Sequence, residues 1–195
     1  MKTKNQKRNL ILAVTSILMA GVLLVTLTST VSAKGPGGNG NAGGLNGGGF
    51  GIGSSTAGTG LALTPLNADE ADALTRAILE EYGALNLYQS VINQFGSVYP
   101  FSTIVTSEQQ HVNALIRQAD KYGVAVPANP GLDASISFNS FSEACADGVE
   151  AEIADAALYD DLKTVTTHSD LLRVYDALQN ASLNSHLPAF EACAY

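Results

Sequence analysis

Four stretches of the chain repeat apolar side chains at intervals of three and four residues, the spacing that places them on one face of an α-helix. The first stretch lies between Asn67, a residue type that caps helices well, and Gly96, a common stop signal. The second follows Pro100 and ends before Gly123. No alternating β-branched pattern competes with these helical patterns between residues 61 and 195. The predicted fold class is therefore all-α.

The third and fourth stretches, together with the loop before them, predict a topology. Ser140 with Glu143 resembles a capping box at the start of the third stretch, and a short break at residues 166–169 precedes the fourth. Pro188 predicts that the fourth helix either kinks or ends there. Residues 124–139 are typical of a loop, which extends to roughly 55 Å and exceeds the roughly 30 Å of a long helix. We therefore expect a four-helix bundle of two antiparallel hairpins joined by a long crossover.

Ionisable side chains interrupt the apolar face of each stretch near its middle. In the second stretch, Glu108 and His111 lie on the same face as the surrounding apolar residues, because they are three positions apart. A buried, unpaired carboxylate is very costly, so such groups are paired, neutralised or bound to a metal. Similar levels of the other three stretches carry Glu81, Glu152 and His186. The sequence therefore predicts one polar site in the bundle interior.

A repeated spacing links the two hairpins. A tyrosine follows a face glutamate by seven residues in the first and third stretches, as Glu81–Tyr88 and Glu152–Tyr159. Two interpretations of these tyrosines stay open. They pack in the core with the hydroxyl near the rim, or they hydrogen-bond to a carboxylate that holds a metal.

Four segments resemble the ferritin-like, rubrerythrin-like four-helix bundle superfamily: ILEEYGALNLY, FSTIVTSEQQH, EAEIADAALY and NSHLPAF. Within that superfamily they resemble an uncharacterised family of exported bacterial and archaeal ferritin-like domains. The resemblance covers about residues 66–192. It implies one Glu from each of two helices and a Glu-x-x-His from each of the other two around a metal pair. Carried over by residue, the single glutamates are Glu81 and Glu152, the first motif is Glu108 with His111, and the second histidine is His186.

The chain departs from the family pattern in the fourth helix. The position three residues before His186 is Leu183, which cannot bind a metal. Asp155, three residues after Glu152 on the same face, offers a compensating carboxylate. Such a mixed set suits iron or manganese, as one or two ions, with zinc also possible. The resemblance thus implies six candidate ligands: Glu81, Glu108, His111, Glu152, Asp155 and His186.

The N-terminal residues are expected to lie outside the fold. Residues 1–33 combine a basic start, an apolar run over residues 10–27 and a small-residue cleavage site, which predicts a signal peptide or an uncleaved anchor. Residues 34–60 are rich in glycine and read as a flexible linker that tethers the domain to a membrane or wall. Residues 61–195 form the predicted domain. Both interpretations predict a secreted or extracytoplasmic domain.

The net charge of the chain bears on its binding partners, and its two cysteines predict a disulfide. The chain has 10 Lys and Arg and 18 Asp and Glu, and four basic residues leave with a cleaved signal, so the net charge becomes 6 minus 18, or −12. An acidic chain without a basic patch argues against nucleic acid as a partner. Cys145 begins the third helix and Cys193 ends the fourth, so an antiparallel hairpin brings them together, and export favours a disulfide.

The helical pattern places two further polar residues outside the predicted site. Glu80 is adjacent to Glu81 but lies off the apolar face, which predicts a solvated side chain. His168 lies in the break before the fourth helix, which predicts a surface or capping residue rather than a ligand.

The expected function is that of an exported metal-binding protein, and the resemblance implies redox activity toward oxygen or peroxide if iron fills the site. The alternative that stays open is a non-enzymatic structural or binding module at the cell surface with a relict or structural metal site.

Overall fold

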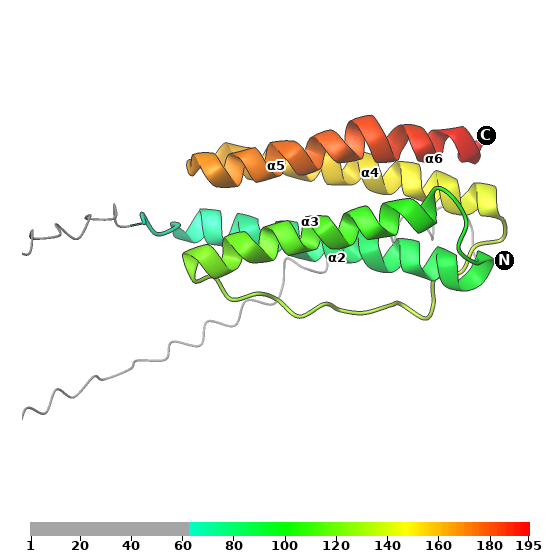
Figure 1. Ribbon diagram of the computed structural model, residues 1–195, viewed down its shortest axis with the longest axis horizontal. Helices are drawn as coiled ribbons and strands as arrows, with labels where there is room; N and C mark the ends of the chain where they lie inside the picture. Colours follow the sequence, from blue (N-terminus) through cyan, green and yellow to red (C-terminus); the bar gives the residue numbers. More distant parts are fainter. Residues whose placement is uncertain (1–62) are drawn as a thin grey trace, which may run out of the picture. The chain divides into compact units, whose positions relative to one another are not determined.

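The computed structural model describes residues 63–195, and within this range all regular structure is helical, which confirms the all-α prediction (Figure 1). The elements are α2 (Ala68–Phe95), α3 (Phe101–Tyr122), α4 (Phe141–Val165), α5 (Ser169–Ala181), the π-helical turn η1 (Ser182–His186) and α6 (Leu187–Ala194). The predicted signal or anchor at residues 1–33 and the linker at residues 34–60 lie outside the described residues. None of the described helices is long and apolar enough to cross a membrane.

The helices form two packed pairs. Helix α2 packs against α3, while α4 packs against the continuous rod of α5, η1 and α6, and α2 also contacts α4. Figure 1 shows the loop after α3 running along the bundle, so that α3 and α4 point in the same direction. Two contacts fasten this loop to α2. Asn86 donates to the side chain of Asn129 at 2.7 Å, and the amide of Gln94 exchanges two hydrogen bonds with the backbone of Phe138.

Side-chain caps define where α2 and α4 begin. Asn67 and Glu70 form a full capping box at the start of α2, with each side chain accepting from the backbone N–H of the other at 3.0 Å. At the start of α4, Ser140 Oγ accepts from the N–H of Glu143 at 3.1 Å. The expected return bond goes elsewhere, because Glu143 Oε2 accepts from the N–H of Asn139 at 2.7 Å. The predicted capping box at Ser140 is therefore only half formed.

The fourth helix does not end at Pro188. A π-helical turn precedes the proline, and the N–H of Leu187 bonds to the carbonyl of Ser182, five residues back. The helix then continues to Ala194. Proline has no N–H to give to the carbonyl four residues back, so a wider turn before it forfeits little hydrogen bonding. This turn changes which side chains of the fourth helix face the interior.

The interior consists of two apolar clusters, one toward each end of the bundle. The first includes Leu74, Ile78, Leu115, Tyr159, Leu162, Leu171 and Tyr175. The second includes Tyr88, Val91, Phe101, Ile104, Phe138 and Phe190. Gly148 permits close packing in the second cluster, because a Cβ there would lie 2.8 Å from the ring of Phe190. The predicted disulfide is confirmed, and Cys145–Cys193 joins α4 to α6 in the second cluster.

Candidate metal centre

Five of the six predicted ligands converge in the bundle interior. Along the chain, each lies between residues of the first apolar cluster and residues of the second. They come from four elements, because α3 supplies two of them and α2, α4 and η1 supply one each. All are buried, with no more than 6 % of any residue exposed. These five residues are Glu81, Glu108, His111, Glu152 and His186. The site is therefore a buried cluster of carboxylates and imidazoles inside the bundle.

The first group of candidate ligands comprises Glu81, Glu108 and His111. His111 Nδ1 lies 3.2 Å from Glu81 Oε2 and 2.9 Å from Glu108 Oε2. One ligand atom from each of the three residues lies within 4.8 Å of the other two. Two carboxylate oxygens and one imidazole nitrogen thus surround one position that a single cation can occupy.

The second group repeats this arrangement with Glu108, Glu152 and His186. His186 Nδ1 lies 2.9 Å from Glu108 Oε1 and 3.4 Å from Glu152 Oε2. Glu108 therefore belongs to both groups and turns one oxygen toward each histidine. This shared carboxylate makes the two positions neighbours, as in sites where one carboxylate bridges two ions.

The orientation of these atoms suits metal binding. Glu108 Oε1 and His186 Nδ1 are buried and only 2.9 Å apart, yet neither has a partner in hydrogen-bonding geometry. Buried polar atoms are nearly always hydrogen-bonded, so orphaned ones need an explanation such as an ion. Here both atoms are of the kinds that iron, manganese and zinc accept. The residues present therefore fit a metal ion.

Glu81 and Glu152, which the resemblance implies as the single glutamate ligands, each receive a hydrogen bond from a tyrosine of the other helix pair. Tyr88 of α2 donates to Oε1 of Glu152, and Tyr159 of α4 donates to Oε1 of Glu81, both at 2.5 Å. The repeated Glu–Tyr spacing thus becomes a crossed pairing between α2 and α4. In each pair the other carboxylate oxygen, Oε2, is the one that faces a histidine. The tyrosines therefore fix the orientation of these carboxylates through the oxygen that does not face a histidine.

Ser107 contacts both histidines and was not recognised from the sequence as a site residue. Its Oγ lies 3.3 Å from Nε2 of His111 and 3.0 Å from Nε2 of His186. The two rings stack with their centroids 5.3 Å apart and their planes 21° apart. The signal in the sequence that could have identified Ser107 is its position directly before Glu108. Its contact with His186, 79 residues away, depends on packing between helices.

Asp155, the sixth predicted ligand, lies outside both groups. Its Oδ2 accepts a hydrogen bond from Ser182 at 2.7 Å, while its buried Oδ1 has no hydrogen-bond partner. Burial raises the pKa of Asp155 well above its ordinary value, and the charges of Glu81 and Glu152 add to this effect. An unpartnered buried carboxylate oxygen next to the two groups keeps Asp155 as a candidate ligand.

The structure corrects the interpretation of Leu183. The resemblance implies that Leu183 stands at the position of the family's fourth-helix glutamate, inside the bundle, but Leu183 is 41 % exposed. Ser182, the first residue of the π-helical turn, is buried instead. In a regular helix the residues three and four positions before His186 both share its face, whereas the wider π-helical turn keeps only the residue four positions before it, Ser182, buried.

Glu80 is also corrected, because it is half-buried rather than solvated. Burial raises its pKa, Arg76 opposes this effect and the charge of Glu152 adds to it. His168 precedes α5 but makes no side-chain cap. Its Nδ1 lies 2.8 Å from Glu70 Oε1, so it is a partner of a buried glutamate near the start of α2 and α5.

Burial and the close contacts between carboxylates and histidines shift the pKa values of the site residues. Burial raises the pKa of Glu81 to about 8, despite the nearby imidazole of His111. Burial acts in the same direction on Glu108, but His111 and His186 outweigh it and lower its pKa to about 2. Burial would lower the pKa values of the histidines, yet the carboxylates raise them to about 10 for His111 and about 9 for His186. Metal ions displace such protons, so binding releases them and tightens as pH rises.

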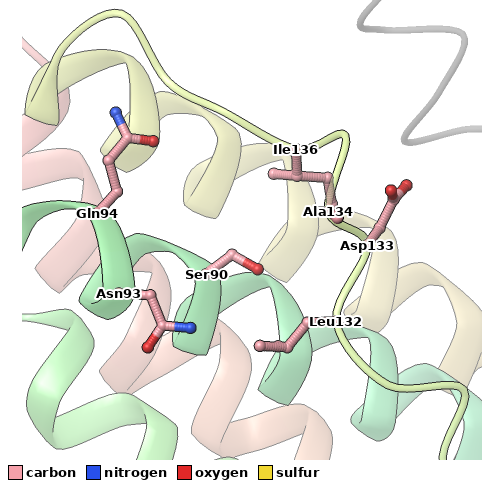
Figure 2. A pocket seen from close by; sticks show the side chains of 7 residues that line it. All are labelled: Ser90, Asn93, Gln94, Leu132, Asp133, Ala134 and Ile136. Atoms are coloured by element: carbon pink, nitrogen blue, oxygen red, sulfur yellow. The ribbon is translucent and has the colours of Figure 1, made fainter.

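A separate hollow lies between α2 and the crossover loop, as Figure 2 shows. It has a volume of about 340 Å³, and Ser90, Asn93 and Gln94 of α2 line it together with loop residues that include Leu132. None of the lining residues is a candidate ligand. The hollow is therefore distinct from the site of buried carboxylates and histidines.

Comparisons with known proteins identify the fold but not a function. No model of a known protein family matches the chain, and no curated protein matches it. A solved structure similar to the chain is that of a hypothetical protein, MJ0754, from Methanococcus jannaschii DSM 2661. The two share 24 % identity with a TM-score of 0.60 over 69 % of this chain and 84 % of the other. Likeness at this identity establishes a shared fold alone.

Proposed function

We propose that the chain is an exported, ferritin-like metal-binding protein that holds two iron or manganese ions in its bundle core. The observation that carries this proposal is the sharing of Glu108 between two groups of buried ligands, Glu81 with His111 and Glu152 with His186. The pattern agrees with the ferritin-like arrangement that the sequence resembles. The confirmed Cys145–Cys193 disulfide supports an oxidising compartment, and hence export.

Charge supports two ions rather than one. When ionised, the four buried carboxylates of Glu81, Glu108, Glu152 and Asp155 carry four negative charges, which two divalent cations balance. Three carboxylates around the two histidines, with Asp155 adjacent, favour iron or manganese, and zinc also accepts these ligands. With iron bound, the chemistry of the site would be the oxidation of Fe(II) by dioxygen or peroxide.

The protein's own residues would have three roles in this function. The histidines offer Nδ1 to the ions, and the tyrosines keep one oxygen of Glu81 and Glu152 turned toward them. The apolar clusters on both sides keep bulk water away, which strengthens every electrostatic interaction in the site. Asp155, with one oxygen free of hydrogen bonds, would complete the ligand set that lacks a fourth-helix glutamate.

The test is a metal analysis of untagged protein that was purified without chelators. We expect about two iron or manganese ions per chain. A Glu108→Gln variant should lose both ions, whereas Glu152→Gln should chiefly lose one, because only Glu108 belongs to both groups. Glu150→Gln is the matched control, since Glu150 is exposed on the same helix as Glu152. Wild-type protein that stays free of metal, with an unchanged melting temperature after Fe(II) or Mn(II) is added, would refute the proposal.

A second candidate function is a non-enzymatic module at the cell surface with a relict or structural metal site. The observation that favours it is that the family's fourth-helix glutamate position is Leu183, which is 41 % exposed and cannot bind a metal. Measuring oxygen and peroxide consumption by the Fe(II)-loaded protein separates the two functions. Bound metal without turnover would support the structural role.

A further inference from the structure

The hydroxyl of Ser107 lies between the two candidate metal-binding histidines, on the side of each ring that is away from the carboxylates. Its Oγ is 3.3 Å from Nε2 of His111 and 3.0 Å from Nε2 of His186. On both rings the other nitrogen, Nδ1, faces the glutamates. One hydroxyl group therefore contacts the outer nitrogen of both rings.

We propose that Ser107 is a positioning residue that makes both histidines bind metal through Nδ1 and thereby supports the affinity of the site for both ions. This inference rests on the proposed function and deepens it by naming a residue that orients the histidines of both groups. The ligand set alone does not determine which ring nitrogen of each histidine binds the metal, and Ser107 would decide this.

The chemistry of imidazole gives the reason. A metal ion on Nδ1 takes the lone pair of that nitrogen, so the neutral ring carries its proton on Nε2. Each Nε2–H then needs an acceptor, because a buried donor without one is unfavourable. A hydroxyl oxygen has two lone pairs, so Ser107 Oγ can accept from both rings at once. Partners of this kind fix the tautomer and the orientation of a ligating histidine.

The position of Ser107 in the fold explains why one residue serves two histidines. Ser107 and His111 are one helical turn apart on α3, while His186 ends the π-helical turn of the other helix pair. The two rings stack with centroids 5.3 Å apart, which brings both Nε2 atoms to the same side. Glu108, the next residue after Ser107, contacts both rings at Nδ1. Two adjacent residues of α3 thus hold both histidines from opposite sides.

The binding test compares wild type, Ser107→Ala and Ser107→Thr by calorimetric titration with Mn(II). We expect Ser107→Ala to raise both dissociation constants by about 10- to 100-fold, the usual effect of losing such a partner. Ser107→Thr keeps the hydroxyl and should restore most of the affinity. Thr106→Ala is the matched control, because Thr106 is the preceding residue of α3 and is exposed. A change in only one dissociation constant, or in neither, would overturn the proposal.

A spectroscopic test reports the orientation directly. In Zn(II)-loaded protein labelled with ¹⁵N-histidine, long-range ¹H–¹⁵N spectra should show a proton on Nε2 and metal on Nδ1 for both His111 and His186. In Ser107→Ala the Nε2–H protons should exchange faster with water. Zinc on Nε2 of either ring in the wild type would contradict the inference, and circular dichroism checks that each variant is folded.

The outcomes distinguish this inference from the proposed function. If wild-type protein binds no Mn(II) or Zn(II), the proposed function fails and the role of Ser107 fails with it. If wild-type protein binds two ions and Ser107→Ala binds both with unchanged affinity, only the role of Ser107 fails.

Discussion

Ser182 donates a 2.7 Å hydrogen bond to Oδ2 of Asp155, and this pair joins the fourth helix to α4 beside the candidate metal centre. Ser182 begins the π-helical turn over Ser182–His186 and lies on the same helix face as the buried Leu178, four residues before it. Asp155 keeps its other oxygen buried and without a hydrogen-bond partner. The pair therefore places a carboxylate where the fourth helix lacks one.

This relationship yields a prediction for Leu183. Leu183→Glu should leave metal stoichiometry and affinity unchanged, because the side chain at this position faces solvent. Asp155→Asn should instead weaken binding of at least one ion, since it removes a negative charge beside Glu81 and Glu152. Both variants are measured by calorimetric titration with Mn(II). A gain in affinity for Leu183→Glu would mean that the residue reaches the interior.

The crossed tyrosines give a second prediction. Tyr88→Phe and Tyr159→Phe each remove the donor to one candidate ligand, Glu152 or Glu81. Each should lower the affinity for the nearer ion by about 10- to 100-fold, because the freed carboxylate loses its orientation. Tyr175→Phe is a matched control, since Tyr175 is also buried but its hydroxyl has no hydrogen-bond partner. Equal affinities for all three variants would limit the tyrosines to core packing.

A third prediction concerns acid stability at Glu70, away from the metal centre. Burial by itself would raise its pKa, but hydrogen bonds from His168, Thr167 and Asn67 outweigh burial and lower the pKa from 4.5 to about 2. A group with a lowered folded-state pKa stabilises the protein above its unfolded value, and that stability disappears as pH falls from 4.5 toward 2. We expect Glu70→Gln to cost about 2 kcal/mol at neutral pH.

The measurement for Glu70 is chemical unfolding with a chelator present, between pH values of about 6 and about 3. The difference between wild type and Glu70→Gln should shrink as the pH falls. The hydrogen bond to Glu70 is the chief cause that raises the pKa of His168, so Glu70→Gln removes this effect as well. A difference that is constant with pH would show that the Glu70 carboxylate is not stabilised in its charged form.

The disulfide gives a fourth prediction. Cys145 and Cys193 are 48 residues apart, so the cross-link should stabilise the fold by about 3 to 4 kcal/mol through chain entropy. Replacing both with serine should lower the unfolding free energy by that amount without changing metal stoichiometry, because the bridge lies in the second apolar cluster. Thiol titration of the native protein should find no free thiol at Cys145 or Cys193. Loss of metal in the double variant would mean that the bridge also shapes the site.

Local sequence signals predicted the helices well because their causes are local. Asn67 and Gly96 bound α2 as expected, and the spacing of apolar residues identified the interior face of each helix. Glu80 was misplaced because periodicity describes one helix at a time, whereas its burial depends on what packs beside α2. The same limit explains why Ser107 was missed, since its contact with His186 joins two helices.

The amino-acid sequence by itself determined which side chains point inward and at what level of the bundle, since helical periodicity places Glu81, Glu108, His111 and Glu152 on apolar faces. It also determined the pairing of the chain's two cysteines. Only the tertiary structure decided that Glu108 is shared between two groups and that Ser182 rather than Leu183 faces the interior. The physical reason is that a π-helical turn rotates every later side chain, and contacts between helices depend on packing that no single stretch encodes.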